Sequence, residues 1–172
     1  MSPAPRRTDP AGAERRLAGF IAKFTPEMAA RIRAARRRMR ALLPTATELV
    51  YDNYNFFVIG YGPGTRPSEA ILSLACQARG ISLCFLQGAG LADPYRLLRG
   101  SGKVVRSLTV ESAATFDRPE VRALVDAALA HAHTQLDPAA RHALVIRSVS
   151  AKQRPRRAAV RPGPAKARRA RS

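Results

Sequence analysis

The first hydrophobic pattern along the chain is that of an amphipathic helix. Thr25 and Pro26 supply an N-cap and a first helical residue, and Pro44 ends the pattern. At about 100° per residue, apolar residues recur on one face: Met28, Ile32, Ala35, Met39 and Leu42. The sequence therefore predicts a helix from Pro26 to about Leu43.

A second helical pattern lies near the end of the chain, after a series of short apolar runs. Asp117 and Pro119 mark its start and Asp137 its end, with apolar residues at helical spacing between them. The runs between the two helices are separated by Gly and Pro: ELVYD, NFFVIGY, AILSLACQ, ISLCFLQ and KVVRSLTV. This order predicts an α+β fold with an antiparallel sheet of about five strands, flanked by an N-terminal and a C-terminal helix.

The third and fourth runs fit a hairpin whose turn lies at residues 77–80. In that register the apolar side chains share one face, with the opposed pairs Leu72–Phe85, Leu74–Leu83 and Cys76–Ile81. The other face carries small residues: Ser73, Ala75, Ser82 and Cys84. We expect two free thiols, and a small-residue face that is either a ligand-sized hollow or the more exposed side of the sheet.

The stretch YDNYNFFVIGY, residues 51–61, holds three of the four tyrosines of the chain. Asp52 and Asn53 form a turn-type pair that separates two strands. Proteins that bind single strands interleave aromatic with basic residues, but no Lys or Arg lies between residues 41 and 65. Core packing therefore accounts for these aromatics better than a stacking platform, and only Tyr54 and Asn55 are candidates for contact with a ligand.

The positive charge of the chain lies mostly at its two ends. Of the 30 Lys and Arg and 12 Asp and Glu, residues 1–40 hold 11 and 3, residues 41–140 hold 8 and 9, and residues 141–172 hold 11 and none. Basic blocks with little apolar surface to bury stay disordered. We therefore expect one domain at residues 20–137, a disordered basic segment at 1–19 and a basic, mostly disordered tail at 138–172.

The tail is expected to bind nucleic acid or another polyanion weakly and without sequence preference. Its positive residues are separated by Ala, Pro and Gly without any acid, so it can follow a phosphate backbone without folding. The candidate residues are Lys152, Arg154, Arg156, Arg157, Arg161, Lys166, Arg168, Arg169 and Arg171. The alternative is a solubilising extension with incidental charge, because the chain as a whole is rich in Arg and Ala.

The patterns of enzymes and metal sites are missing. The GSGK run at 100–103 lacks the first Gly of a phosphate loop, and Val104 stands where such a loop has Ser or Thr. His131 and His133 would point apart on a helix, and neither cysteine has a base beside it in sequence. We expect a non-enzymatic protein without cofactor or metal. No apolar run reaches the roughly 20 residues of a membrane-spanning helix, so a cytoplasmic protein with no membrane partner is expected; the oligomeric state is not predicted.

Motifs within about residues 26–132 occur in a recognisable order: a helix ending in RALLP, then ELVYDNYNFFVIGYG, then ISLCFLQGAGLADPYRLLRGSGKVVRSL, then the closing helix. This order resembles the YdhG-like domain family, also called domain of unknown function 1801, and implies a helix, an antiparallel sheet and a second helix. Positions that match the family pattern are Glu48, Phe57, Leu91, Asp93, Pro94, Gly102, Lys103 and Arg106. Asn55 stands where the family often has Pro, and Arg79-Gly80 where it often has Lys-His.

The resemblance implies no settled activity, although some members have been discussed as frataxin-like iron chaperones. Iron at such a surface needs clustered carboxylates, whereas the first predicted helix has six arginines between Arg31 and Arg40 and Glu27 as its only acid. A frataxin-like iron-binding chaperone is therefore an alternative to the main interpretation, which is a small non-enzymatic binding or scaffold domain with a nucleic-acid-binding tail.

A ligand site is expected around Arg106, whose position in KVVRSLTV places it on the apolar face of a strand. A buried guanidinium needs a partner, for which Glu48 and Asp93 are candidates. Two alternatives follow for Arg106: an internal ion pair, or a pocket that binds an anion or small molecule. With the second alternative, the protein would be a small-molecule or anion-binding domain whose tail has no binding role. The candidate site gathers Glu48, Tyr54, Asn55, Asp93, Lys103 and Arg106.

Overall fold

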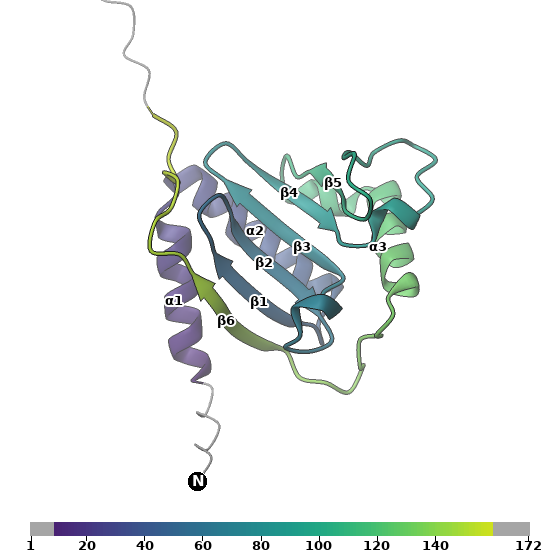
Figure 1. The fold of residues 1–172 in the computed structure, drawn as a ribbon, viewed down its shortest axis with the longest axis horizontal. Helices are drawn as coiled ribbons and strands as arrows, with labels where there is room; N and C mark the ends of the chain where they lie inside the picture. Colours follow the sequence, from purple (N-terminus) through teal and green to yellow (C-terminus); the bar gives the residue numbers. More distant parts are fainter. Residues whose placement is uncertain (1–8, 160–172) are drawn as a thin grey trace, which may run out of the picture.

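The computed structural model describes residues 9–159 as a sheet covered by helices (Figure 1). The helices are α1 (Pro10–Ala22), α2 (Pro26–Leu42) and α3 (Pro119–His131). Short 3₁₀ helices are η1 (Pro67–Glu69), η2 (Gly88–Gly90) and η3 (Ala113–Asp117). The strands are β1 (Thr47–Asp52), β2 (Phe57–Gly62), β3 (Leu72–Gln77), β4 (Gly80–Phe85), β5 (Arg106–Thr109) and β6 (Ala143–Val149).

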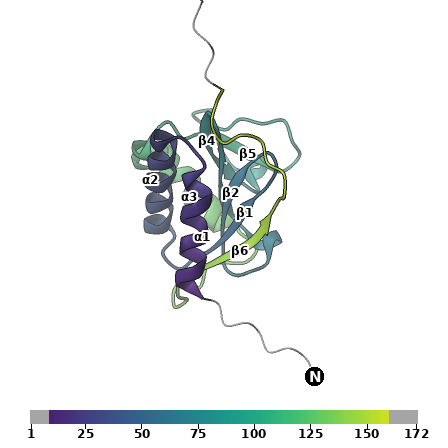
Figure 2. The same cartoon turned by 90° about the vertical axis from the view of Figure 1, so that its left-hand side faces the viewer.

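The architecture is α+β with a mixed six-stranded sheet in the order β5-β4-β3-β2-β1-β6. Consecutive strands from β1 to β5 pair antiparallel, whereas β6 joins the edge of the sheet parallel to β1. Figure 2 shows the three α-helices on one side of this sheet. The core therefore lies between the helices and one sheet face, and the other face is the thinner side of the molecule.

The first predicted helix and the five predicted strands are confirmed. α2 begins at Pro26, and the hydroxyl oxygen of Thr25 accepts a hydrogen bond from the backbone N–H of Met28 at 3.3 Å. The second predicted helix is shorter than expected because α3 ends at His131. Asp117 does not cap that helix, since its carboxylate pairs with Arg38 at 2.8 Å.

The expected domain limits of 20 and 137 are too narrow. α1 begins at Pro10, within the segment expected to be disordered, residues 1–19, and it buries Leu17 from that segment together with Phe20 and Ile21 in the core. β6 lies within the expected tail, residues 138–172, and it pairs with β1 along six positions. Folding of both segments follows from apolar surface that each one buries. Residues 1–8 and 160–172 lie outside the part of the chain that the structure describes.

The predicted register of the β3–β4 hairpin is confirmed. Leu72 pairs with Phe85, Leu74 with Leu83 and Cys76 with Ile81, and all six side chains are buried in the core. Successive residues of a strand point to opposite faces, so Cys84 lies on the opposite sheet face from Cys76. Both thiols are free.

Candidate functional site

The structure does not bring the six residues of the expected ligand site together. Glu48 lies on β1 and Arg106 on β5, with β2, β3 and β4 between them. Four strand spacings separate the two backbones by roughly 19 Å, which is too far for one small ligand to contact both. The expected site around Arg106 and Glu48 is therefore wrong.

Arg106 and Asp93 do not pair with each other, because each side chain forms hydrogen bonds with backbone groups instead. The guanidinium of Arg106 donates to the carbonyl oxygens of Gly102 and Val105, the second at 2.8 Å. The carboxylate of Asp93 accepts the backbone N–H groups of Leu97 and Leu98 at 2.9 and 2.8 Å. Neither side chain forms the internal ion pair that the sequence suggested, because each one stabilises its own loop.

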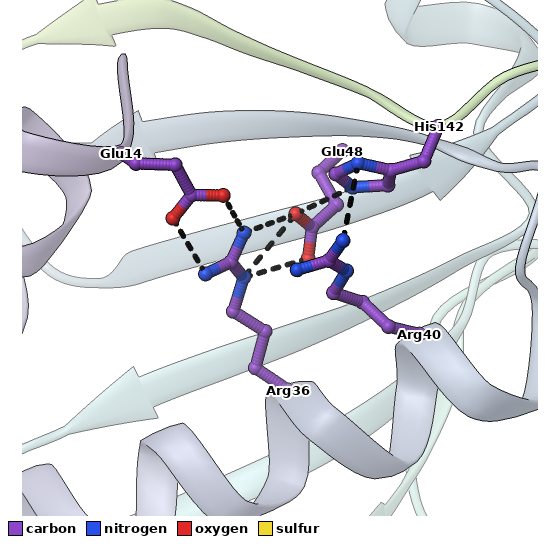
Figure 3. A network of polar contacts seen from close by, with 5 residues as sticks. All are labelled: Glu14, Arg36, Arg40, Glu48 and His142. Atoms are coloured by element: carbon purple, nitrogen blue, oxygen red, sulfur yellow. Dashed lines mark hydrogen bonds and ion pairs between the residues drawn. The ribbon is translucent and has the colours of Figure 1, made fainter. Parts of the chain in front are cut away.

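Glu48 belongs to a buried ion network instead (Figure 3). Its side chain is fully buried and accepts from Arg36, with Nη2 2.6 Å from Oε2 and Nε 2.9 Å from Oε1. Arg36 also donates to both carboxylate oxygens of Glu14 at 2.7 and 2.9 Å. A single guanidinium therefore joins α1, α2 and β1, in the planar two-oxygen geometry that arginine favours.

His142 closes the network from the loop before β6. Its Nε2 lies 2.9 Å from Oε2 of Glu48, and its Nδ1 lies 3.5 Å from Nη2 of Arg40. A guanidinium can only donate, so this arrangement fits a neutral ring that accepts at Nδ1 and donates its Nε2–H to Glu48. The hydrogen bond from Arg36 lowers the pKa of Glu14. The network joins α1, α2, β1 and the loop before β6. Its residues line none of the pockets described below, so we assign it a structural role.

A second buried carboxylate, Asp52, fixes the segment that follows β6. Asp52 Oδ2 accepts from Nζ of Lys23 at 2.6 Å, and its Oδ1 accepts from Nη2 of Arg156 at 2.9 Å. Arg156 is 5% exposed and lies over the ring of Phe24 at 6.0 Å. Arg156 was expected to contact nucleic acid, but a buried and paired guanidinium cannot do so. We call residues 150–157 the C-terminal segment.

The C-terminal segment runs beside the turn between β1 and β2. The backbone N–H of Ser150 donates to the carbonyl of Asp52, and that of Arg154 donates to the carbonyl of Tyr54, both at 2.9 Å. These bonds place the guanidinium of Arg154 5.9 Å from the centre of the Tyr54 ring. The tyrosine keeps half of its surface exposed, so an aromatic ring and a cation lie together at the surface.

A hollow of about 190 Å³ adjoins this pair. Its lining comes from three places in the sequence: Asn55 at the first turn, residues 77–79 at the β3–β4 turn, and residues 154–156. Arg79 and Arg154 are exposed and have no acidic partner among the described residues. We call Tyr54, Asn55, Arg79 and Arg154 the clasp surface, and no acidic side chain lines its hollow.

The sequence identified three of the four residues of this surface but not Arg79. Tyr54 and Asn55 were candidates, and Arg154 was expected to contact a polyanion, but nothing joined them, because they are about a hundred residues apart. The missing signal was the run ALVIRSV at residues 143–149, whose β-branched residues are typical of a strand. A strand predicted at this run would have placed the following residues beside the sheet, close to the turn between β1 and β2.

The remaining expected residues are not part of the clasp surface as defined. Lys103 is exposed in the loop before β5, and Lys152 and Arg157 are exposed in the C-terminal segment. Arg161, Lys166, Arg168, Arg169 and Arg171 lie outside the described residues. Between residues 9 and 159 there is no group of three or more His, Cys, Asp or Glu side chains arranged to hold a metal ion. Within the same range, no helix combines the length and the hydropathy needed to cross a membrane.

Comparison of the chain with family models, curated proteins and solved structures gives no match. The fold and the clasp surface therefore stand on the geometry alone, and the YdhG-like resemblance stays a prediction.

Proposed function

We propose that this protein is a non-enzymatic module that binds single-stranded nucleic acid without sequence preference, through the clasp surface and the basic residues that follow it. The observation that carries the proposal is the contact between the exposed Tyr54 ring and Arg154, beside Arg79 and without an acidic neighbour. Single-strand sites combine an aromatic ring, on which a base stacks, with cations that follow the phosphates.

The distribution of charge supports a polyanionic ligand. Within residues 9–159 there are 23 Lys and Arg against 12 Asp and Glu. Two of those acids, Glu48 and Asp52, are buried and neutralised by internal partners, so they contribute little to the outer field. Each of them also cancels a cation from the same count, so the excess of positive over negative charge among the described residues is unchanged and still favours a polyanion.

A preference for single strands follows from the shape of the clasp surface. It is built from two turns and an irregular segment, and it offers no helix or two-stranded ribbon that could enter the major groove. The contacts available are ring stacking and phosphate pairing, which every sequence can supply. Five further cations after residue 160 would lengthen the path of the strand along the chain.

Replacing the tyrosine separates stacking from charge. Tyr54→Ala should weaken binding of a labelled oligo(dT) by about 1 to 3 kcal/mol in fluorescence anisotropy, because one base loses its stacking partner. Inorganic polyphosphate has no bases, so its affinity for the variant should stay unchanged. Tyr95→Ala is the matched control, since Tyr95 is exposed in a different loop. Equal oligo(dT) affinity for the Tyr54 variant and the unaltered protein would refute the proposal.

A further inference from the structure

A second site lies at the C-terminal end of α3, away from the clasp surface. A hollow of about 60 Å³ is lined by η1, by the residues on either side of η2 and by the end of α3, and its apolar lining includes Ile71, Phe85, Leu91 and Ala128. A wider hollow of about 240 Å³ adjoins it, shares Gln87, His131 and His133 with it, and reaches Lys103. The two together form one depression with an apolar end and a polar end.

Two glycines shape the walls of the smaller hollow. A Cβ at Gly62 would lie 2.9 Å from Cα of Ala70, and one at Gly88 would lie 2.6 Å from Cβ of Arg106. Both distances are shorter than side chains tolerate, so each glycine allows a close backbone approach. The first brings η1 against β2 and the second brings η2 against β5, and these approaches position two of the three walls.

Of the polar side chains that the two hollows share or adjoin, His131 has an internal hydrogen-bond partner and three others have none. Within the described part of the chain, the side chains of Gln87, His133 and Thr134 make no hydrogen bond with other protein groups. Nδ1 of His131 lies 3.0 Å from the carbonyl oxygen of Ala127 and donates to it, which leaves Nε2 free. Convergent polar groups above an apolar floor are the usual features of a small-molecule site.

The charges of the two hollows differ. Glu69 is the acid that lines the smaller hollow, and its carboxylate lies 3.7 Å from Arg66. The wider hollow has no acidic lining residue, and Lys103 lines it together with Gln87 and the two histidines. An apolar group is therefore favoured in the first hollow and an anionic group in the second.

We propose that this depression binds a short amphipathic carboxylate, with its hydrocarbon part on the apolar lining of the smaller hollow and its carboxylate beside Lys103. Burial of the hydrocarbon supplies the affinity, and the charge-assisted contact with Lys103 selects an acid over the corresponding alcohol. The site is independent of the proposed nucleic-acid binding, because it shares no lining residue with the clasp surface.

The test uses hexanoate and 1-hexanol as probes, followed by amide chemical shifts of the isotope-labelled protein. Hexanoate should cause saturable shifts confined to η1, η2 and the end of α3. Ala132→Leu, which places a larger side chain in the smaller hollow, should weaken binding by about tenfold or more. Ala130→Leu is the matched control, because Ala130 is exposed two residues earlier, in the last turn of α3, and lines neither hollow. Melting temperatures close to that of the unaltered protein establish that both variants fold.

Lys103→Gln tests the anionic part of the proposal. It should weaken hexanoate binding by about tenfold while leaving the affinity for 1-hexanol unchanged. The proposal is overturned if hexanoate causes no saturable shift, if the shifts map elsewhere, or if Ala132→Leu binds as tightly as Ala130→Leu. Equal effects of Lys103→Gln on the acid and the alcohol would overturn the assignment of a carboxylate.

Discussion

Glu48 and Asp52 are both fully buried carboxylates on β1, and each one accepts hydrogen bonds from side chains of other parts of the fold, including at least one cation. A buried charge without a partner is strongly destabilising, whereas a paired one is close to neutral. Glu48 is joined by Arg36 and His142, and Asp52 by Lys23 and Arg156. These two residues therefore make the fold depend on particular side chains of α1, α2 and the segments around β6.

Arg36→Met should reduce the free energy of unfolding by about 3 to 5 kcal/mol, because it leaves the buried Glu48 without its guanidinium. Urea denaturation measures the loss. Arg37→Met is the control, since Arg37 is the neighbouring exposed residue on the same helix and should change stability by less than about 0.5 kcal/mol. The double change Arg36→Met with Glu48→Met should recover most of the loss. Similar small effects of the two single changes would show that the network contributes little.

Asp52 should contribute to the fall in the free energy of unfolding at acid pH. Burial by itself would raise the pKa of Asp52, but hydrogen bonds from Lys23, Arg156 and Gln153 outweigh it and hold the pKa below 3.8, its usual value. The folded pKa is lower than the unfolded one, so the contribution to stability is complete above about pH 4 and is lost as the pH falls through the folded value. Urea unfolding between pH 2 and 6 should show a shallower acid limb for Asp52→Asn. Parallel curves for the two proteins would contradict this assignment.

At the scale of elements, the β3–β4 hairpin offers a chemical test of its register. Cys76 lies in the core, where burial raises the pKa of its thiol to about 12, and Cys84 lies on the open face and is partly exposed. Thiolates react and thiols do not, so a thiol reagent should label Cys84 faster than Cys76 in the native protein. Mass spectrometry of the labelled peptides measures the order. A register shifted by one residue would exchange the two faces and reverse it.

Local patterns predicted α2 and the first five strands because each of these elements carries its own signal. Thr25-Pro26 starts a helix, and the hairpin register follows from matching apolar positions. β6 was missed because it pairs in parallel with β1, about 95 residues earlier. A parallel pair has no hairpin turn in the sequence that would indicate the pairing. α1 was missed because three charged residues next to one another, Glu14, Arg15 and Arg16, concealed the helical spacing of Leu17, Phe20 and Ile21.

The candidate site was predicted only in its local part, for the same physical reason. The turn at Asp52-Asn53 identified Tyr54 and Asn55 as exposed, but a cation that contacts Tyr54 comes from residue 154. The expected pairing of Glu48 with Arg106 was wrong because the strands that carry them, β1 and β5, are not neighbours in the sheet. The order of strands in the sheet decides which charges meet, and that order is a property of the whole fold.

At the scale of the whole molecule, the C-terminal segment has two roles. Arg156 anchors it to Asp52 inside the protein, and Arg154 then stands beside Tyr54 at the surface. The structural anchor thus positions a residue of the proposed binding surface. A chain ending at Ala159 keeps both roles, whereas one ending at Val149 removes the anchor together with the cations and cannot separate the two effects.

The salt dependence of oligo(dT) binding shows whether the clasp surface contacts nucleic acid. Fluorescence anisotropy measures it for the full chain, for a chain ending at Ala159 and for the shorter chain with Arg79→Ala and Arg154→Ala. Each lost phosphate contact should reduce the slope of log affinity against log salt by about 1. The account predicts that the chain ending at Ala159 still binds in a salt-sensitive way, with a lower slope than the full chain, and that the double change lowers it by about 2 further. An unchanged slope in the double variant, or no salt-sensitive binding by the chain ending at Ala159, would contradict a nucleic-acid site at the clasp surface.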